Sequence, residues 1–433
     1  MLVLMVLIGS TVAACGPSAT VTSPAPAGPT PSVTVPFELP ITIALLGQFD
    51  GDTLAVLDTQ IAAFEVRNPD VKVEIITKPG SLSQQPASSL REQYAAILGN
   101  EDTRVDILLL DDTWLVEFTT NGGLTPLDGY ASAEGVELEG FFPAAMEAST
   151  VGRQLMALPW TVDVGLLYYR QDLLEKRGYA PPDTWADVQR VALGIQGAEA
   201  LPLGFVWQGA AYESLTCNTL EHVWASGGQV LDEGGRVAFD SPQTRAALQQ
   251  MADLVTSGAS PQEIATYKEQ TALIAFQEGD TALMRNGSYA WAILNDDDSP
   301  LAGRVGVARL PATCLTGQSL ALSAFSLHPE QAFRFMAFLA AYDQQLWLAL
   351  GAGQPPALEA VYHDRMLGND APFWDALHAA LSDARPRPRS VAYQDLSAAI
   401  YDEVNKMLAG EQDVAATAAN AQRGIESAVQ PKP

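Results

Sequence analysis

Short apolar runs alternate with longer amphipathic segments along the first quarter of the chain. The apolar runs predict strands at 41–46, 71–76 and 105–110, and the last is almost wholly apolar, as buried parallel strands are. Between them, 53–68 repeats apolar residues at three- and four-residue spacing, which predicts an amphipathic helix, and 89–98 is expected to be a second helix. This alternation predicts a doubly wound α/β sheet, whose ligands bind beyond the carboxyl ends of its strands.

The middle of the chain carries a second β-rich stretch. Leu166–Tyr169 is predicted to be a buried strand, and two consecutive prolines separate it from a helix that begins at Trp185. Asp163 stands between Trp160 and this strand. A carboxylate at that position is poorly placed for a core and well placed at the mouth of a cleft.

A chain of 433 residues is too long for one ordinary core and predicts two lobes. Sheet-forming runs occur before Pro159 and again after Val305, so crossovers are expected near Pro159, near 300–305 and near 353–356. Such connections permit bending and restrict twisting, which suits hinge closure of a cleft. The predicted lobes are 41–158 plus 301–355 (lobe 1) and 159–300 plus 356–433 (lobe 2).

The N-terminal residues combine a short apolar run with a cysteine. Residues 1–14 are too short for a permanent anchor and predict a signal peptide, although no Lys or Arg precedes the run. Val12-Ala-Ala-Cys15 resembles the lipobox of bacterial lipoproteins, in which the cysteine is acylated; a buried free cysteine is the alternative. Residues 15–40 are rich in Pro, Ser and Thr and predict a flexible tether. The protein is therefore expected to be lipid-anchored at the extracellular face of a bacterial membrane or in the periplasm.

Two cysteines remain when Cys15 is set aside. Cys217 and Cys314 form an even pair in a chain that is expected to be exported, which suggests a disulfide. Two separate buried thiols are the alternative, because the sequence does not establish that these residues are close together.

The charge of the chain excludes some partners. Lys and Arg number 24 against 51 Asp and Glu, a formal net charge of −27. Such a chain repels phosphate backbones and anionic membranes, so no nucleic-acid partner is expected and membrane contact is expected through the lipid only. The alternative explanation of the acidic excess is that it only keeps a secreted protein soluble. With 4 His and no Cys/His cluster, neither a metal site nor a cofactor is expected.

Carboxylates beside aromatic residues are the most distinctive chemical feature. Asp111 precedes Trp114, Asp163 follows Trp160, and Tyr289 follows a short predicted strand. Carboxylates accept charge-assisted hydrogen bonds from sugar hydroxyls, and aromatic rings cover the apolar C–H faces of sugars. The sequence therefore favours a sugar cleft. The alternative is that the tryptophans pack in a core or hinge and the aspartates cap helices.

The stretch from Gly152 to Trp185 contains, in order, a glycine turn, Leu-Pro, an aspartate, a Leu-Tyr-Tyr strand, a glycine, and Pro followed by Thr-Trp. This order resembles the family 1 extracellular solute-binding proteins, the sugar-capturing components of ABC importers. The similarity extends from about Ile41 to Glu426, and the trehalose/maltose-binding branch is the most similar. It implies an α/β fold with two periplasmic-binding-protein-like lobes. Each lobe would be a doubly wound, mostly parallel sheet flanked by helices, with a hinge of about three crossovers.

The resemblance also implies the ligand-binding residues. Relatives carry aromatic residues at the positions of Gly287 and Gln318, so specificity for trehalose or maltose does not follow. Asp111 and Asp163 are expected to face the cleft from opposite lobes. The residues expected to bind ligand are Asp111, Trp114, Trp160, Asp163, Tyr289, Gly317, Gln318 and Arg387.

The function that the resemblance implies is capture of a di- or oligosaccharide in the cleft between the lobes. A monomer without enzymatic activity would then deliver the sugar to the permease subunits of an ABC transporter. Two alternatives stay open: a secreted glycoside hydrolase that uses paired aspartates, and the same fold binding a non-sugar solute such as a polyol.

Overall fold

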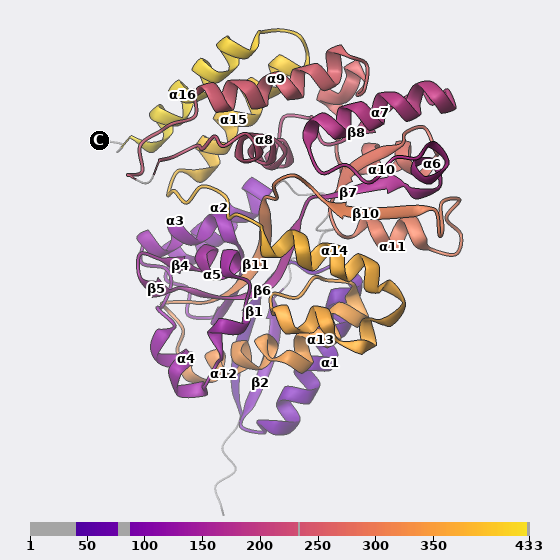
Figure 1. The fold of residues 1–433 in the computed structure, drawn as a ribbon. Helices are drawn as coiled ribbons and strands as arrows, with labels where there is room; N and C mark the ends of the chain where they lie inside the picture. The colour runs from indigo at the N-terminus through magenta and orange to yellow at the C-terminus, as the bar shows by residue number, and fades with distance from the viewer. Residues whose placement is uncertain (1–39, 77–86, 233, 431–433) are drawn as a thin grey trace, which may run out of the picture. The chain divides into compact units, whose positions relative to one another are not determined.

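The computed structural model describes residues 40–76, 87–232 and 234–430. These residues form two sheets and a small ribbon of β4 (Thr150–Val151) and β5 (Gln154–Leu155), as Figure 1 shows. The predicted signal peptide, the lipidation site Cys15 and nearly all of the tether lie outside this described part. Within it, no helix has both the length and the apolar character that a bilayer span requires.

The first sheet has five strands in the order β2-β1-β3-β11-β6. All of its strands except β11 run in one direction, because β11 is antiparallel to both of its neighbours. The strands are β1 (Ile41–Leu46), β2 (Val71–Ile76), β3 (Ile107–Asp111), β6 (Ala157–Val164) and β11 (Leu315–Leu322). The three strands predicted near the N-terminus are thus confirmed.

Helices on both faces of this sheet bury its apolar side chains. The amphipathic segment predicted at 53–68 forms α1, which begins after Asp50, whose carboxylate accepts the N–H of Thr53 at 2.7 Å. Phe64 of α1 packs edge-on against Phe335, with ring centroids 4.9 Å apart. The helices are α1 (Gly51–Arg67), α2 (Ala87–Gly99), α3 (Leu115–Thr120), α4 (Asp128–Glu134), α5 (Pro143–Ala148), α12 (Pro329–Ala340), α13 (Tyr342–Ala352) and α14 (Ala371–Ser382).

The second sheet has the order β10-β7-β9-β8, and here β7 is the reversed strand. Its strands are β7 (Leu166–Arg170), β8 (Phe205–Val206), β9 (Leu283–Asn286) and β10 (Val305–Arg309). The helices packed around it are α6 (Gln171–Arg177), α7 (Trp185–Glu199), α8 (Glu213–Ala225), α9 (Pro242–Thr256), α10 (Glu269–Gln277), α11 (Ala290–Asn295), α15 (Tyr393–Leu408) and α16 (Val414–Val429). The predicted α/β class is confirmed, with one reversed strand in each sheet.

The predicted crossovers are misplaced. The chain leaves the first sheet through Gly165, not near Pro159, because β6 continues to Val164. Pro159 lies on the edge strand β6, at a register shift in its pairing with β11, and at such a position the missing N–H of proline breaks no regular ladder hydrogen bond. Gly165 has no room for a side chain, since a Cβ there would lie 2.4 Å from Nη2 of Arg285.

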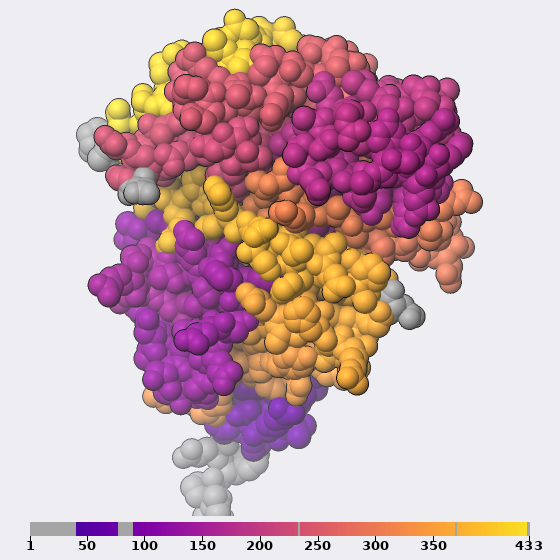
Figure 2. All heavy atoms as spheres, in the orientation of Figure 1, coloured from indigo at the N-terminus to yellow at the C-terminus, as the bar shows by residue number. Residues whose placement is uncertain are grey.

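The other two connections also differ from the prediction. β10 was assigned to lobe 1 but pairs with β7 of the second sheet, so the chain returns at 310–314, after β10 and not before it. Residues 356–382 were assigned to lobe 2. They instead contact both sheets: the ring centroids of Tyr362 and Phe142 are 5.3 Å apart, and α14 packs against β6 of the first sheet and against β10 of the second. The chain then passes through residues 383–392 to α15. In Figure 2 the orange atoms of this segment lie against the purple atoms of the first core.

Candidate functional site

Three adjacent strands place polar side chains on one face of the first sheet. Asp111 at the end of β3 is paired with Gln318 of β11, and Gln318 is paired with Thr161 of β6. Asp163 lies two residues beyond Thr161, and its partner on β11 is Thr316. Alternate residues and cross-strand partners share a face, so these side chains meet. They line a cavity of about 480 Å³.

Gly317 belongs to this wall, as predicted, and only glycine fits there. A Cβ at this position would lie 2.5 Å from the carbonyl oxygen of Thr161. Tyr289, at the start of α11, closes the opposite wall and remains 40% exposed. The structure thus brings Asp111, Asp163, Tyr289, Gly317 and Gln318 together at one cavity, and that they bind a ligand stays a prediction.

Asp163 is oriented by two backbone N–H groups. Its Oδ1 accepts from Val164 at 2.9 Å and from Ser288 at 3.2 Å. Burial raises the pKa of the Asp163 carboxyl, although hydrogen bonds from Ser288 and Val164 and the charge of Arg285 oppose the shift. Asp163 therefore connects the first sheet to the turn before α11, and its carboxylate is more easily protonated than an exposed one.

Asp111 is held by a cation behind it. Its Oδ1 accepts from the N–H and hydroxyl of Thr113 at 2.9 and 2.6 Å and from Nη2 of Arg387 at 3.0 Å. Burial alone would raise the pKa of Asp111, but Arg387 and Thr113 overcome it and hold the pKa below the usual value. The Asp111 side chain thus stays ionised where it lines the cavity.

Arg387 is buried among three carboxylates. Besides Asp111 it contacts Asp112, and its Nη1 donates to Oε1 of Glu213 at 2.8 Å. Glu213 also accepts from the hydroxyl of Tyr393 at 2.5 Å. Burial raises the pKa of Asp112 to about 8; Arg387 opposes this shift and the neighbouring Asp111 adds to it. Arg387 therefore joins β3 of the first sheet to α8 beside the second.

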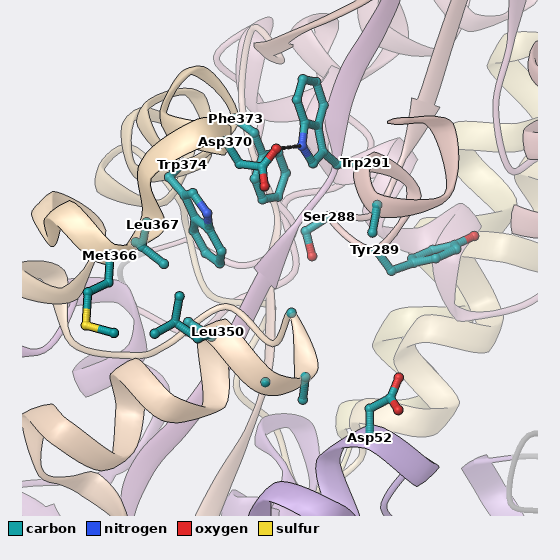
Figure 3. A pocket seen from close by; sticks show the side chains of 15 residues that line it. Asp52, Ser288, Tyr289, Trp291, Leu350, Met366, Leu367, Asp370, Phe373 and Trp374 are labelled. Atoms are coloured by element: carbon teal, nitrogen blue, oxygen red, sulfur yellow. Dashed lines mark hydrogen bonds between the residues drawn. The ribbon is translucent and has the colours of Figure 1, made fainter. Parts of the chain in front are cut away.

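A second cavity of about 520 Å³ continues from the first. The two share a boundary formed by the turn before α11 and the end of α13, including Ser288, Tyr289 and Gly353. Figure 3 shows the second cavity, with Trp374 and Leu367 on one side and Tyr289 on the other. Its wall is more aromatic, with Trp291, Phe373 and Trp374. The two cavities form one cleft that has a carboxylate end and an aromatic end.

Three predicted residues lie elsewhere among the described residues. Trp114 is 4% exposed and packs edge-on against Tyr94, so it belongs to a core. Trp160 is 1% exposed and packs against Phe49. Arg387 lines neither of these two cavities and contacts the first one only indirectly, through its hydrogen bond to Asp111. Burial explains the two tryptophans: Trp114, in the 3₁₀ segment Asp112–Trp114 that follows β3, and Trp160, on β6, both point into packed side chains.

Several cleft residues were missed. Asp50 and Gln354 face the first cavity, where Nε2 of Gln354 donates to Asp50 at 3.1 Å. Ser288 and Trp291 lie beside Tyr289, which was the one ligand-binding residue predicted in that segment. Trp374 follows the start of α14, and nothing in its local pattern separates it from a core residue. Asp111 and Asp163 were also expected on opposite lobes, but both belong to the first sheet.

The charged residues that line the cleft are all acidic. Asp50, Asp111 and Asp163 line the first cavity, and Asp52 and Asp370 line the second. Of the described residues, no Lys or Arg lines either of these cavities. The walls offer hydrogen-bond acceptors and apolar ring faces, which suits a neutral ligand rich in hydroxyl groups and disfavours an anion.

Cys217 and Cys314 lie side by side in the protein interior. Both are buried free thiols in the structure, and their sulfur atoms are 2.9 Å apart. Burial raises the pKa of the Cys314 thiol, and the hydrogen bond to Cys217 acts in the same direction. The proximity supports the predicted bridge, which stays a prediction.

We expect the exported protein to contain the bridge. Intact mass after alkylation in denaturant without reductant should show no modified thiol at these two positions, and both should be modified once a reductant is added. A bridge closing a loop of this length constrains the unfolded chain, so reduction should lower the stability by about 2–5 kcal/mol. Two thiols that alkylate fully without reductant would refute the bridge.

The family model described as bacterial extracellular solute-binding protein matches residues 51–346. The "Probable ABC transporter-binding protein" of Deinococcus radiodurans is 35% identical over 335 residues, 73% of this chain and 78% of that protein. The structure of T. maritima MalE3 with maltose bound is similar with a TM-score of 0.77 and 38% identity, over 89% of this chain and 99% of that one. The mannitol-binding protein of Pseudomonas aeruginosa is 23% identical over 72% of each chain.

Proposed function

Since the chain belongs to the bacterial extracellular solute-binding proteins, we propose that it captures a neutral di- or oligosaccharide and delivers it to an ABC permease. The cleft composition carries this proposal. Carboxylates at one end supply acceptors for hydroxyl groups, and aromatic side chains at the other supply flat apolar surfaces. The maltose in the T. maritima structure makes α-linked glucose the first sugar to test.

A polyol is the second candidate, supported by the mannitol-binding relative. A polyol offers hydroxyl groups to Asp111 and Asp163 but no ring face to Trp374. A polyol ligand would therefore use the first cavity and leave the aromatic end unfilled. A third candidate, glycoside hydrolysis, requires that two carboxylates cleave the bound sugar. The family consists of binding proteins, and we propose that this chain returns its sugar uncleaved.

A thermal-shift screen tests the proposed ligand class. The panel contains maltose, maltotriose, trehalose, glucose, mannitol and ribitol, because a ligand that binds only the folded state raises the melting temperature. A rise with the glucose oligosaccharides supports the proposal, and a rise with mannitol alone favours the polyol. No rise with any member of the panel would contradict both. Chromatography of the recovered ligand tests for hydrolysis.

Asp163→Ala is expected to weaken sugar binding by roughly 5- to 150-fold, the equivalent of about 1–3 kcal/mol, because sugar hydroxyls lose a buried acceptor. Isothermal titration with the sugar found in the screen measures the change. Glu134→Ala, an exposed change on α4 away from these cavities, serves as the control and should bind as the wild type does. Unchanged affinity in both Asp163→Ala and Asp111→Ala would place the ligand elsewhere.

Acid should weaken binding through the same residue. The pKa of Asp163 is raised, so its carboxylate is lost as the pH falls through that raised value, and an acceptor for sugar is lost with it. Asp163→Asn no longer titrates and should show a flatter pH profile from about pH 8 to pH 5. An equally steep profile in that variant would contradict this assignment.

We also propose that Cys15 carries the lipid that tethers a monomer to the membrane. One acylated N-terminus is the membrane attachment that the sequence indicates. Cys15→Ser should move the protein from the membrane fraction to the soluble fraction after cell lysis. A wild-type protein that is already soluble and retains residues 1–14 would refute the lipid anchor.

A further inference from the structure

The aromatic end of the cleft contains a contact between the two sides of the cavity. Trp291 belongs to α11, which follows β9 of the second sheet. Its Nε1 donates to Oδ1 of Asp370 at 3.0 Å, at the end of the 3₁₀ segment Arg365–Asp370. Its ring also stacks on Phe373 at a centroid distance of 5.3 Å and an interplanar angle of 12°. Figure 3 shows the dashed contact at the edge of the cavity.

The Asp370 carboxylate accepts a hydrogen bond from Trp291 and does not cap its own helix. It stands at the N-cap position of α14, where an aspartate ordinarily accepts a backbone N–H of the first turn. The side chain makes no such capping bond, and Pro372 removes one of the donors. The Asp370 carboxylate accepts the Trp291 indole N–H instead. The orientation of this indole is thus fixed by a residue from the opposite wall.

The same contact lies outside the first cavity, which Asp111 and Asp163 line. Trp291, Asp370 and Phe373 line only the second cavity, whereas Asp111 and Asp163 line only the first. Phe373 is 5% exposed and packs against Trp374 at 5.1 Å, so its position is set by the core behind it. Trp291 is therefore held between a buried ring and a carboxylate in the aromatic end of the cleft.

On the basis of the proposed function, we infer that Trp291, held by Asp370 and Phe373, closes the far end of the cleft and limits the length of the bound oligosaccharide. One face of the indole is covered by Phe373, and its N–H is used by Asp370. Trp291 is thus a boundary of the cavity, and Trp374 and Tyr289 remain as ring faces for the sugar. Removing Trp291 opens the end where further sugar units would lie.

The test compares affinities for maltose, maltotriose, maltotetraose and maltopentaose in four variants. Trp291→Ala removes the boundary, and Asp370→Ala releases the indole. Asp370→Asn is the matched control, since an amide oxygen still accepts the indole N–H. Trp291→Phe retains a ring against Phe373 but has no N–H. Melting temperature without ligand shows that each variant is folded.

The readout is the ratio of maltotetraose affinity to maltose affinity. We expect this ratio to rise by about ten-fold in Trp291→Ala, about 1.4 kcal/mol, with maltose affinity almost unchanged. Asp370→Ala should raise the ratio less, and Asp370→Asn should match the wild type. Folded variants that bind maltose with an unchanged ratio would overturn this inference and leave the proposed function intact. If Trp291→Ala weakens the binding of every sugar equally, the inference is overturned, because Trp291 would then be a residue that stacks on the sugar. A wild type that binds none of these sugars would overturn the proposed function as well.

Discussion

Replacing Arg285 by methionine should lower the free energy of unfolding by about 3–5 kcal/mol, because it leaves a buried carboxylate without its cation. Glu221 is 0% exposed, and its two oxygens accept from Nε and Nη2 of Arg285 at 3.1 and 2.6 Å. Nη1 of Arg285 also donates to the buried Gln208 at 2.9 Å. Denaturation followed by circular dichroism measures the loss as a lower midpoint.

The double variant Arg285→Met with Glu221→Leu is the control. It removes both charges, so it should be more stable than Arg285→Met alone. Burial raises the pKa of Glu221 despite Arg285, and without the cation it should rise further. A group whose pKa is raised on folding costs stability as the pH increases, so the deficit of Arg285→Met should shrink toward about pH 5. A deficit that is constant with pH, or a double variant as unstable as the sum of its parts, would contradict this account.

Arg387→Met is expected to impair both stability and sugar binding. Arg387 is 5% exposed and is the cation shared by Asp111, Asp112 and Glu213. Without it, the pKa of Asp111 should rise, because burial would no longer be opposed by a neighbouring positive charge. We expect at least about a ten-fold loss of sugar affinity near neutral pH, and a loss of stability of about 3 kcal/mol.

Two variants separate the effect of the Arg387 charge from the effect of its hydrogen-bond geometry. Arg387→Lys keeps a positive charge but not the planar fork that reaches several carboxylates, so it should be intermediate. Tyr393→Phe removes only the hydroxyl that donates to Glu213 at 2.5 Å, so it should have a small effect. The affinity deficit of Arg387→Met should grow as the pH is lowered, because Asp111 becomes protonated more easily in the variant. An affinity that equals the wild type from about pH 8 to pH 6 would show that Asp111 does not depend on Arg387.

Local sequence was enough for the parts of the fold that follow from periodicity. The three N-terminal strands and α1 repeat apolar residues at the spacing of their own secondary structure, so their positions are readable before any tertiary contact is known. The aspartates Asp111 and Asp163 were readable because each follows or ends an apolar strand. A charged residue is rarely buried in a core, so an aspartate beside a buried strand is expected to face a cavity or solvent.

Tertiary structure decided which side chains meet. Trp114 and Trp160 have the same local setting as site residues, yet each is packed against an aromatic ring from a distant segment. The lobe boundaries failed for a similar reason. An apolar run such as β10 is compatible with either sheet, and only its pairing with β7 assigns it to the second.

The sequence by itself therefore determined the α/β class, the carboxylate end of the cleft and the acidic character of the chain. Only the tertiary structure brought Trp291, Phe373 and Trp374 to the aromatic end, set Arg387 behind Asp111, and put Cys217 beside Cys314. The physical reason is that hydrophobic periodicity is a property of neighbours along the chain, whereas these contacts join segments separated by many residues. Their energies depend on burial and geometry that no local pattern contains.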